Sequence, residues 1–162
     1  MKQFEKVYEE NKKLDKVFDD LYDMSNLDIN RKNKLELLVE LGELTNETKC
    51  FKYWSNKSFD IDKVKEEYAD CMQMILYFFN KFNISLEEDF KMTKIYYDTI
   101  DLFGNLYKLC SDFYHNEDRD LIKEIFVKFI DLGHQLGLSD NDIIESCLRK
   151  INKNFKRFEE GF

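Results

Sequence analysis

Two pairs of acidic residues are spaced so that each pair occupies one face of a helix. Glu40 and Glu43 are three residues apart, and so are Glu67 and Asp70. A separation of three residues leaves two side chains roughly 60° apart around a helix. Met74 falls in line with the second pair. These carboxylates therefore border the side that the helix should bury rather than lying at the centre of its solvent face.

Ionised carboxylates at the edge of a core need a partner. Burial of an unpaired charge is unfavourable by several kcal/mol, and two pairs in one interior would also repel each other. A hard divalent cation with a preference for oxygen ligands solves both problems, most simply Mg²⁺. A run of acidic residues at this helical spacing is more often a solvated helix face with intrahelical ion pairs. Two pairs on consecutive helices, both beside apolar residues, favour a metal site made by Glu40, Glu43, Glu67 and Asp70.

A second metal chemistry has to be weighed against the first. Ferritin-like di-iron bundles use Glu-x-x-His on two of their helices, and the chain contains Asp112-x-x-His115 and Asp131-x-x-His134. Both histidines fall at expected helix C-termini, where an imidazole is favourable for capping alone. With Asp in place of Glu and no other His in the chain, the pattern favours Mg²⁺ over a di-iron centre.

The C-terminal segment is basic in an acidic chain. Lys150, Asn154 and Arg157 recur at helical spacing, beside the apolar Ile151 and Phe155. Cations near a helix C-terminus complement the helix dipole. Beside a metal site, however, a Lys and an Arg on one stripe are suited to bind phosphate, the Lys as a point charge and the Arg as a fork. A metal with a phosphate clamp indicates phosphoryl or pyrophosphoryl hydrolysis.

Helical periodicity extends over nearly the whole chain and predicts the elements that must position these side chains. We expect an all-α helix bundle of about six helices, forming a single domain over residues 1–162. Ser85 followed by Glu88 and Ser139 followed by Asp142 are typical helix starts. The expected helices cover about 2–24, 31–53, 60–82, 86–114, 118–135 and 140–158.

Composition limits the class of protein. The 25 basic and 33 acidic residues give a net charge of −8, which argues against a nucleic-acid or membrane-surface partner. Pro is absent and Gly occurs 5 times, which favours uninterrupted helices. The four cysteines form no CxxC pair and indicate free thiols in a reducing compartment. With no apolar run of membrane length and a charged start, we expect a cytoplasmic protein.

Two segments together resemble one enzyme family. Residues 40–55 read ELGELTNETKCFKYWS and residues 66–70 read EEYAD. They resemble the dimeric all-α dUTP diphosphatases (dUTPases) of bacteria, phages and trypanosomatids, which belong to the wider all-α NTP pyrophosphatase group that includes MazG. The spacing Lys150-x3-Asn154-x2-Arg157-x3-Gly161-Phe162 is similar to the closing motif of that family, with Phe where Tyr is usual.

This resemblance implies an enzyme that hydrolyses dUTP to dUMP and pyrophosphate, with dUDP as a further candidate substrate. Glu40, Glu43, Glu67 and Asp70 would bind Mg²⁺ ions that hold the phosphate chain. One glutamate of the first pair would also act in catalysis. Our choice is Glu43, which would orient or deprotonate the attacking water, with Glu40 beside it.

The resemblance also implies the substrate contacts. Lys150 and Arg157 would neutralise the phosphate chain, and Asn154 would contact the nucleotide. Lys52 and Trp54 match a patch of the family motif near the substrate, although Trp54 is equally suited to core packing. Two further positions depart from the family pattern and bear on base reading, Asn11 where relatives often carry Gln and Gln73 where they carry His.

Three expectations stay open at this point. The family pairs through helices, and a chain with 15 Phe, 9 Tyr and 1 Trp carries more apolar surface than one small bundle easily hides, so we expect a homodimer. One alternative function is a MazG-like pyrophosphatase of another nucleoside triphosphate such as dCTP. The other is a helical interaction protein without catalysis.

Overall fold

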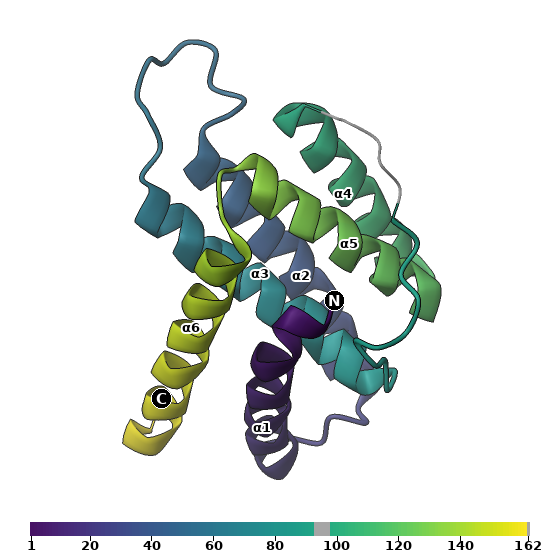
Figure 1. Cartoon of the computed structure of the whole chain (residues 1–162). Helices are drawn as coiled ribbons and strands as arrows, with labels where there is room; N and C mark the ends of the chain where they lie inside the picture. The colour runs from purple at the N-terminus through teal and green to yellow at the C-terminus, as the bar shows by residue number, and fades with distance from the viewer. Residues whose placement is uncertain (93–97, 162) are drawn as a thin grey trace.

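The fold was examined in a computed structural model, which describes residues 1–92 and 98–161. These residues form α-helices and one short 3₁₀ helix, with no strand among them, which confirms the expected all-α class (Figure 1). The 3₁₀ helix Lys2–Phe4 leads directly into the first helix. The helices are α1 Glu5–Leu21, α2 Leu27–Thr48, α3 Ile61–Lys81, α4 Thr99–His115, α5 Arg119–Gln135 and α6 Asp140–Glu160.

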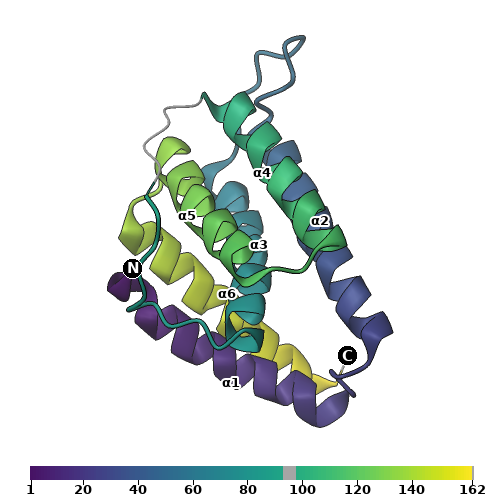
Figure 2. The ribbon, with the colours of Figure 1, turned by 90° about the vertical axis from the view of Figure 1, so that its right-hand side faces the viewer.

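α3 is the central helix of the bundle. It packs against α1, α2, α5 and α6, and aromatic side chains on several of its faces are fully buried, among them Tyr68, Phe78 and Phe79. α1 and α6 run side by side although they come from opposite ends of the chain (Figure 2). α3 therefore presents its flank to helices from both halves of the sequence.

The four cysteines are free thiols, as expected from their spacing in the sequence. Cys71, Cys110 and Cys147 are buried in the helical core, and Cys50 is half-buried. Among the described residues, no helix combines the length and apolar character needed to cross a bilayer.

One expected helix start is wrong. Ser85 and Glu88 do form the local pattern, because the backbone N–H of Ser85 donates to the Glu88 carboxylate at 2.9 Å. The carboxylate also pairs with Arg119 and Lys123 of α5, and Leu86 is buried in the core. These contacts hold the segment as a turn against α5, so tertiary packing overrides the local signal.

The other boundaries shift by a few residues. α4 begins only at Thr99, capped by Asp98, and residues 93–97 of the expected helix lie outside the described residues. α2 begins at Leu27 rather than 31 and stops at Thr48, because Lys49 adopts a left-handed conformation with φ of 54°. The start of α6 is confirmed: Ser139 and Asp142 form a reciprocal capping box.

A close contact between α3 and α5 fixes the rotation of the central helix. The ring of Tyr68 stacks on Phe129 with centroids 4.3 Å apart, and its hydroxyl donates to the Phe129 carbonyl oxygen at 2.8 Å. A Cβ at Gly133 would lie 2.7 Å from the same hydroxyl oxygen. The missing side chain of Gly133 therefore makes room for Tyr68, which lies between the acidic Glu67 and Asp70 in the sequence.

We predict that Gly133→Ala destabilises the protein by about 1–3 kcal/mol, because the added methyl group overpacks a contact that cannot relax without moving Tyr68. Urea denaturation measures the effect. Gly104→Ala is the matched control, since nothing lies within 4 Å of a Cβ there, and it should stabilise α4 by about 0.5–1 kcal/mol. Equal stabilisation by both substitutions would contradict the proposed role of Gly133.

Candidate active site

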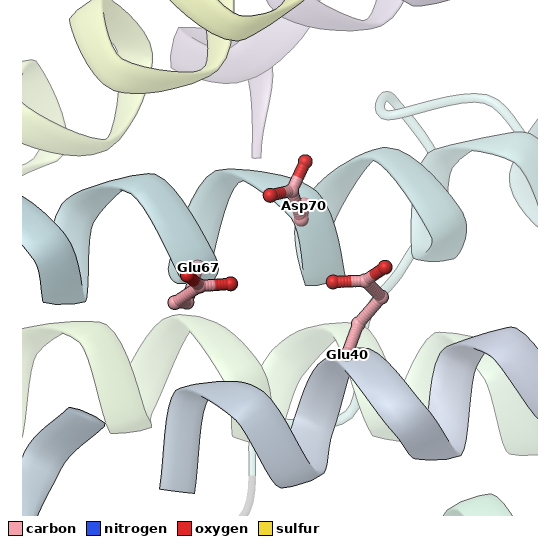
Figure 3. Close-up of side chains that lie close together, drawn as sticks. All are labelled: Glu40, Glu67 and Asp70. Atoms are coloured by element: carbon pink, nitrogen blue, oxygen red, sulfur yellow. The ribbon is translucent and has the colours of Figure 1, made fainter. Parts of the chain in front are cut away.

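α2 and α3 bring three carboxylates together. Glu40 of α2 and Glu67 and Asp70 of α3 each place one carboxylate oxygen within 4.8 Å of the others. Figure 3 shows the Glu40 side chain approaching the two α3 carboxylates from the facing helix. The set contains only oxygen donors, which is the donor chemistry of hard divalent cations such as Mg²⁺. The side chains present therefore fit the metal that the sequence predicts.

Glu43, the fourth expected ligand, lies beside this group. It is exposed on α2 and lines the same cavity as Glu40 and Asp70. It also lines a shallow groove with Glu67. All four acidic residues thus lie around one junction of α2 and α3, with three of them in direct reach of one ion.

The acidic group is electrostatically strained. Burial raises the pKa of Glu40 to about 7, and the negative charges of Asp70 and Glu43 add to the effect. Burial also raises the pKa of Glu67 and of Asp70. The causes are those expected when several carboxylates share a poorly solvated site. A bound cation would remove this penalty.

α6 supplies a positive charge to the same junction. The Lys150 ammonium nitrogen lies 2.5 Å from Oδ2 of Asp70, and only 11% of the Lys150 side chain is exposed. This ion pair opposes the effect of burial on the pKa of Asp70. Lys153 pairs instead with Glu66 at 2.5 Å on the outer side of α3. The two cations therefore lie on different sides of α3, with Lys150 turned to the acidic group.

A cavity of about 420 Å³ opens next to the carboxylates. Residues from α1, α2, α3 and α6 line it. The first and the last helix of the chain therefore both contribute to the cavity wall. Five of the lining residues are substrate contacts that the sequence predicts, namely Asn11, Gln73, Lys150, Asn154 and Arg157. The polar and charged lining residues are Asn11, Asp15, Asn33, Glu36, Glu40, Glu43, Asp70, Gln73, Lys150, Asn154 and Arg157. The volume is in the range of small-ligand sites.

Two amide atoms of this cavity are buried without a hydrogen-bond partner among the described residues: Oδ1 of Asn11 and Nε2 of Gln73. The remaining amide atoms of both side chains are engaged. Nδ2 of Asn11 donates to Asp15 at 3.3 Å, and Oε1 of Gln73 accepts from Asn154 at 3.1 Å. The cavity thus offers one unpaired acceptor and one unpaired donor, which a ligand can satisfy.

The structure does not bring Lys52 and Trp54 to these residues within one chain. Both lie in the loop between α2 and α3, which extends away from the bundle (Figure 1). Lys52 donates to the side chain of Asn46 at 3.1 Å. Trp54 is 66% exposed and packs edge-on against Tyr53. Their role as substrate contacts stays a prediction.

The histidines also lie elsewhere. Nε2 of His134 lies 2.8 Å from Asp140 at the start of α6, and His115 is the last residue of α4. The group of possible metal ligands found among the described residues contains no histidine. The arrangement therefore matches an oxygen-ligand site rather than a di-iron centre.

Sequence reasoning missed Asp15. This residue of α1 is 6% exposed and lines the cavity. The signal was present, because Asp15 follows Asn11 by four residues and so shares its helix face, next to the buried Leu14. A carboxylate beside an apolar stripe that also carries a site residue is itself a candidate site residue.

Comparison with protein families decides between the enzyme classes that this geometry allows. A family model described as dUTPase matches residues 3–162, almost the whole chain. The chain belongs to the dUTPase family. This confirms the resemblance read from the sequence, and membership of the wider MazG-like group is consistent with it. The dUTPase family is one of nucleotide pyrophosphohydrolases, so the protein is an enzyme. A search of curated proteins gave no match.

The strain in the acidic group predicts an unusual effect of charge removal. In EDTA at pH 8, Glu40→Gln should raise the free energy of unfolding by about 1–2 kcal/mol, after allowance for solvent screening, because the ionised carboxylate is disfavoured in the folded state. The raised pKa means that this penalty appears only above the ordinary glutamate pKa of about 4.5 and is complete above about pH 7. The gain should therefore vanish at pH 4.

Denaturation at pH 4 and pH 8 measures both parts of this prediction. The control is Glu145→Gln, an exposed α6 residue whose substitution should change stability by less than about 0.5 kcal/mol at either pH. A Glu40→Gln protein that is less stable than wild type at pH 8 would show that Glu40 is held by favourable contacts instead.

Proposed function

We propose that this dUTPase-family enzyme hydrolyses dUTP to dUMP and pyrophosphate with Mg²⁺ as its metal. The observation that carries the proposal is the convergence of Glu40, Glu67 and Asp70, because Glu40 and Asp70 also line a cavity that contains Lys150 and Arg157. Carboxylates for a metal and cations for a phosphate chain thus face one space of small-ligand size.

Glu40, Glu67 and Asp70 would hold the metal, with Glu43 at their side. Mg²⁺ bound there supplies positive charge that stabilises the phosphate oxygens in the transition state. The oxygen-only donor set and the raised pKa of Glu40 support this assignment, because both point to carboxylates that need a cation.

The remaining chemistry belongs to side chains of the chain. Glu43 would orient a water molecule and accept its proton as the water oxygen forms a bond to phosphorus. The phosphoanhydride bond breaks, and the electron pair leaves with the departing phosphate group. Lys150 and Arg157 would neutralise the charge on that group, Lys150 as a point charge and Arg157 as a two-pronged donor. The same steps applied to dUDP would give dUMP and inorganic phosphate.

The unpaired amide atoms support a pyrimidine base as the ligand. The N3–H group of uracil is a donor flanked by two carbonyl acceptors. The Oδ1 acceptor of Asn11 and the Nε2 donor of Gln73 are complementary to this edge. Asn154, which holds Gln73 in place, would then help to position the base from α6. The alternative is that this enzyme is a MazG-like pyrophosphatase of another nucleoside triphosphate such as dCTP, which the nucleotide assay below tests.

We predict Mg²⁺-dependent release of pyrophosphate from dUTP, abolished by EDTA. Glu43→Gln should lower kcat by about 100-fold or more, because proton transfer from the attacking water is lost, and Glu145→Gln should leave kcat unchanged. A panel of nucleoside triphosphates gives the specificity. No response to dUTP together with activity on dCTP would contradict the base assignment.

A thermal shift with Mg²⁺ and a non-hydrolysable dUTP analogue tests the last alternative. A metal–nucleotide site stabilises the fold by mass action and raises the melting temperature. If the chain is a non-catalytic interaction protein, we expect no change in melting temperature.

We also propose a cytoplasmic homodimer. Exposed apolar side chains on α2 and the loop that follows it support self-association: Leu35, Val39, Phe51, Tyr53 and Trp54. Burial of such a set stabilises a helix-mediated interface. We predict that sedimentation velocity at micromolar concentration shows a species of twice the chain mass of 19.7 kDa. A single species at the monomer mass would contradict the dimer.

A further inference from the structure

Asp15 is a buried carboxylate that the proposed chemistry does not use. It lines the cavity from α1, and its two oxygens accept hydrogen bonds from two different amides. Oδ1 accepts from Nδ2 of Asn11 at 3.3 Å, and Oδ2 accepts from Nδ2 of Asn80 at 2.9 Å. Asp15 thus connects an amide of α1 that lines the cavity with an amide of α3 behind it.

This contact fixes which atom of Asn11 faces a ligand. Above about pH 7, where Asp15 is ionised, its carboxylate can only accept hydrogen bonds, so the NH₂ group of Asn11 has to turn toward Asp15. The backbone carbonyl oxygen of Gln73, 3.5 Å from the same nitrogen, adds a second acceptor on that side. Oδ1 of Asn11 is therefore left as the buried, unpaired acceptor, and rotation of the amide by 180° would place two acceptors against each other.

A fixed acceptor at this position distinguishes uracil from cytosine. The ring nitrogen N3 of uracil carries a hydrogen and donates, whereas N3 of cytosine accepts. Against Oδ1 of Asn11, uracil forms a hydrogen bond, while cytosine faces oxygen with a lone pair and leaves both groups unsatisfied. A buried polar group without a partner is costly, and sites of this kind discriminate strongly between ligands.

We propose that Asp15 is a positioning residue that makes the enzyme select uracil over cytosine, because it holds the Asn11 amide with its oxygen toward the base. This inference rests on the proposed dUTP activity and adds a residue through which its specificity is set.

The environment of Asp15 supports a specific role for the carboxylate. Burial raises the pKa of Asp15 to about 7, with a further contribution from the nearby Asp19, against the effect of the two amide hydrogen bonds. An Asn at this position would avoid the unfavourable burial of charge. Its own amide, however, could present either an oxygen or an NH₂ group to Asn11, so the orientation of Asn11 would no longer be fixed.

The test is Asp15→Asn, which keeps the shape of the side chain. We expect the ratio of kcat/KM for dUTP to that for dCTP to fall at least 10-fold, through a higher KM for dUTP and a lower KM for dCTP. The kcat for dUTP should stay within about 3-fold of wild type, because the acidic group and the cations are untouched. Asp20→Asn, an exposed residue of the same helix, removes the same charge and should leave the ratio unchanged.

Asp15→Ala provides a second variant, in which the Asn11 amide is also free to rotate, and the ratio should fall in the same direction. An unchanged ratio in either folded variant would overturn the inference. Equal losses of kcat on both nucleotides with unchanged KM values would also overturn it, because they would indicate a structural role alone.

If the proposed function is wrong, the wild-type protein will show no dUTP turnover. In that case, calorimetric measurement of dUMP and dCMP binding tests the role of Asp15 independently. Preferential binding of dUMP by wild type that is lost in Asp15→Asn supports the inference, and an identical affinity ratio in the two proteins rejects it.

Discussion

Burial of several carboxylates at the α2–α3 junction is the central energetic constraint in this protein. Burial disfavours the charged forms of Glu40 and Asp70 and raises the pKa of each, and the negative charge of Asp70 adds to the effect on Glu40. The junction nevertheless closes because α3 is buried against four other helices. Apolar packing of the central helix thus holds together an acidic group whose charges are unfavourable there, and a bound cation would stabilise it.

The sequence predicted this junction well because helix geometry is regular. A spacing of three residues places Glu40 with Glu43 on one stripe of α2, and Glu67 with Asp70 on one stripe of α3, whatever the details of packing. The capping box at Ser139 was equally readable, because it depends on neighbouring residues alone. Local rules therefore sufficed for the helices that hold the acids and for the start of the helix that carries Lys150.

Features that depend on residues far apart in the sequence could not be predicted from local patterns. The Ser85 turn looked like a helix start, but its Glu88 is bound by side chains of α5, which no local pattern reveals. The helix face that Asp15 shares with Asn11 could be read from the sequence, but its hydrogen bond with Asn80 became visible only once α3 was placed beside α1. Lys52 and Trp54 show the reverse case: a motif can predict proximity to substrate while the fold of one chain leaves both outside the cavity.

The pairing of α1 with α6 has a consequence for how the enzyme is made. The cavity draws residues from the first and the last helix of the chain, so the nucleotide pocket cannot form on the ribosome until α6 has emerged. The acidic residues of α2 and α3 are synthesised long before Lys150, and until then their repulsion has no counter-charge from within the chain. If the proposed metal site binds Mg²⁺, the ion would supply the missing positive charge while the bundle closes.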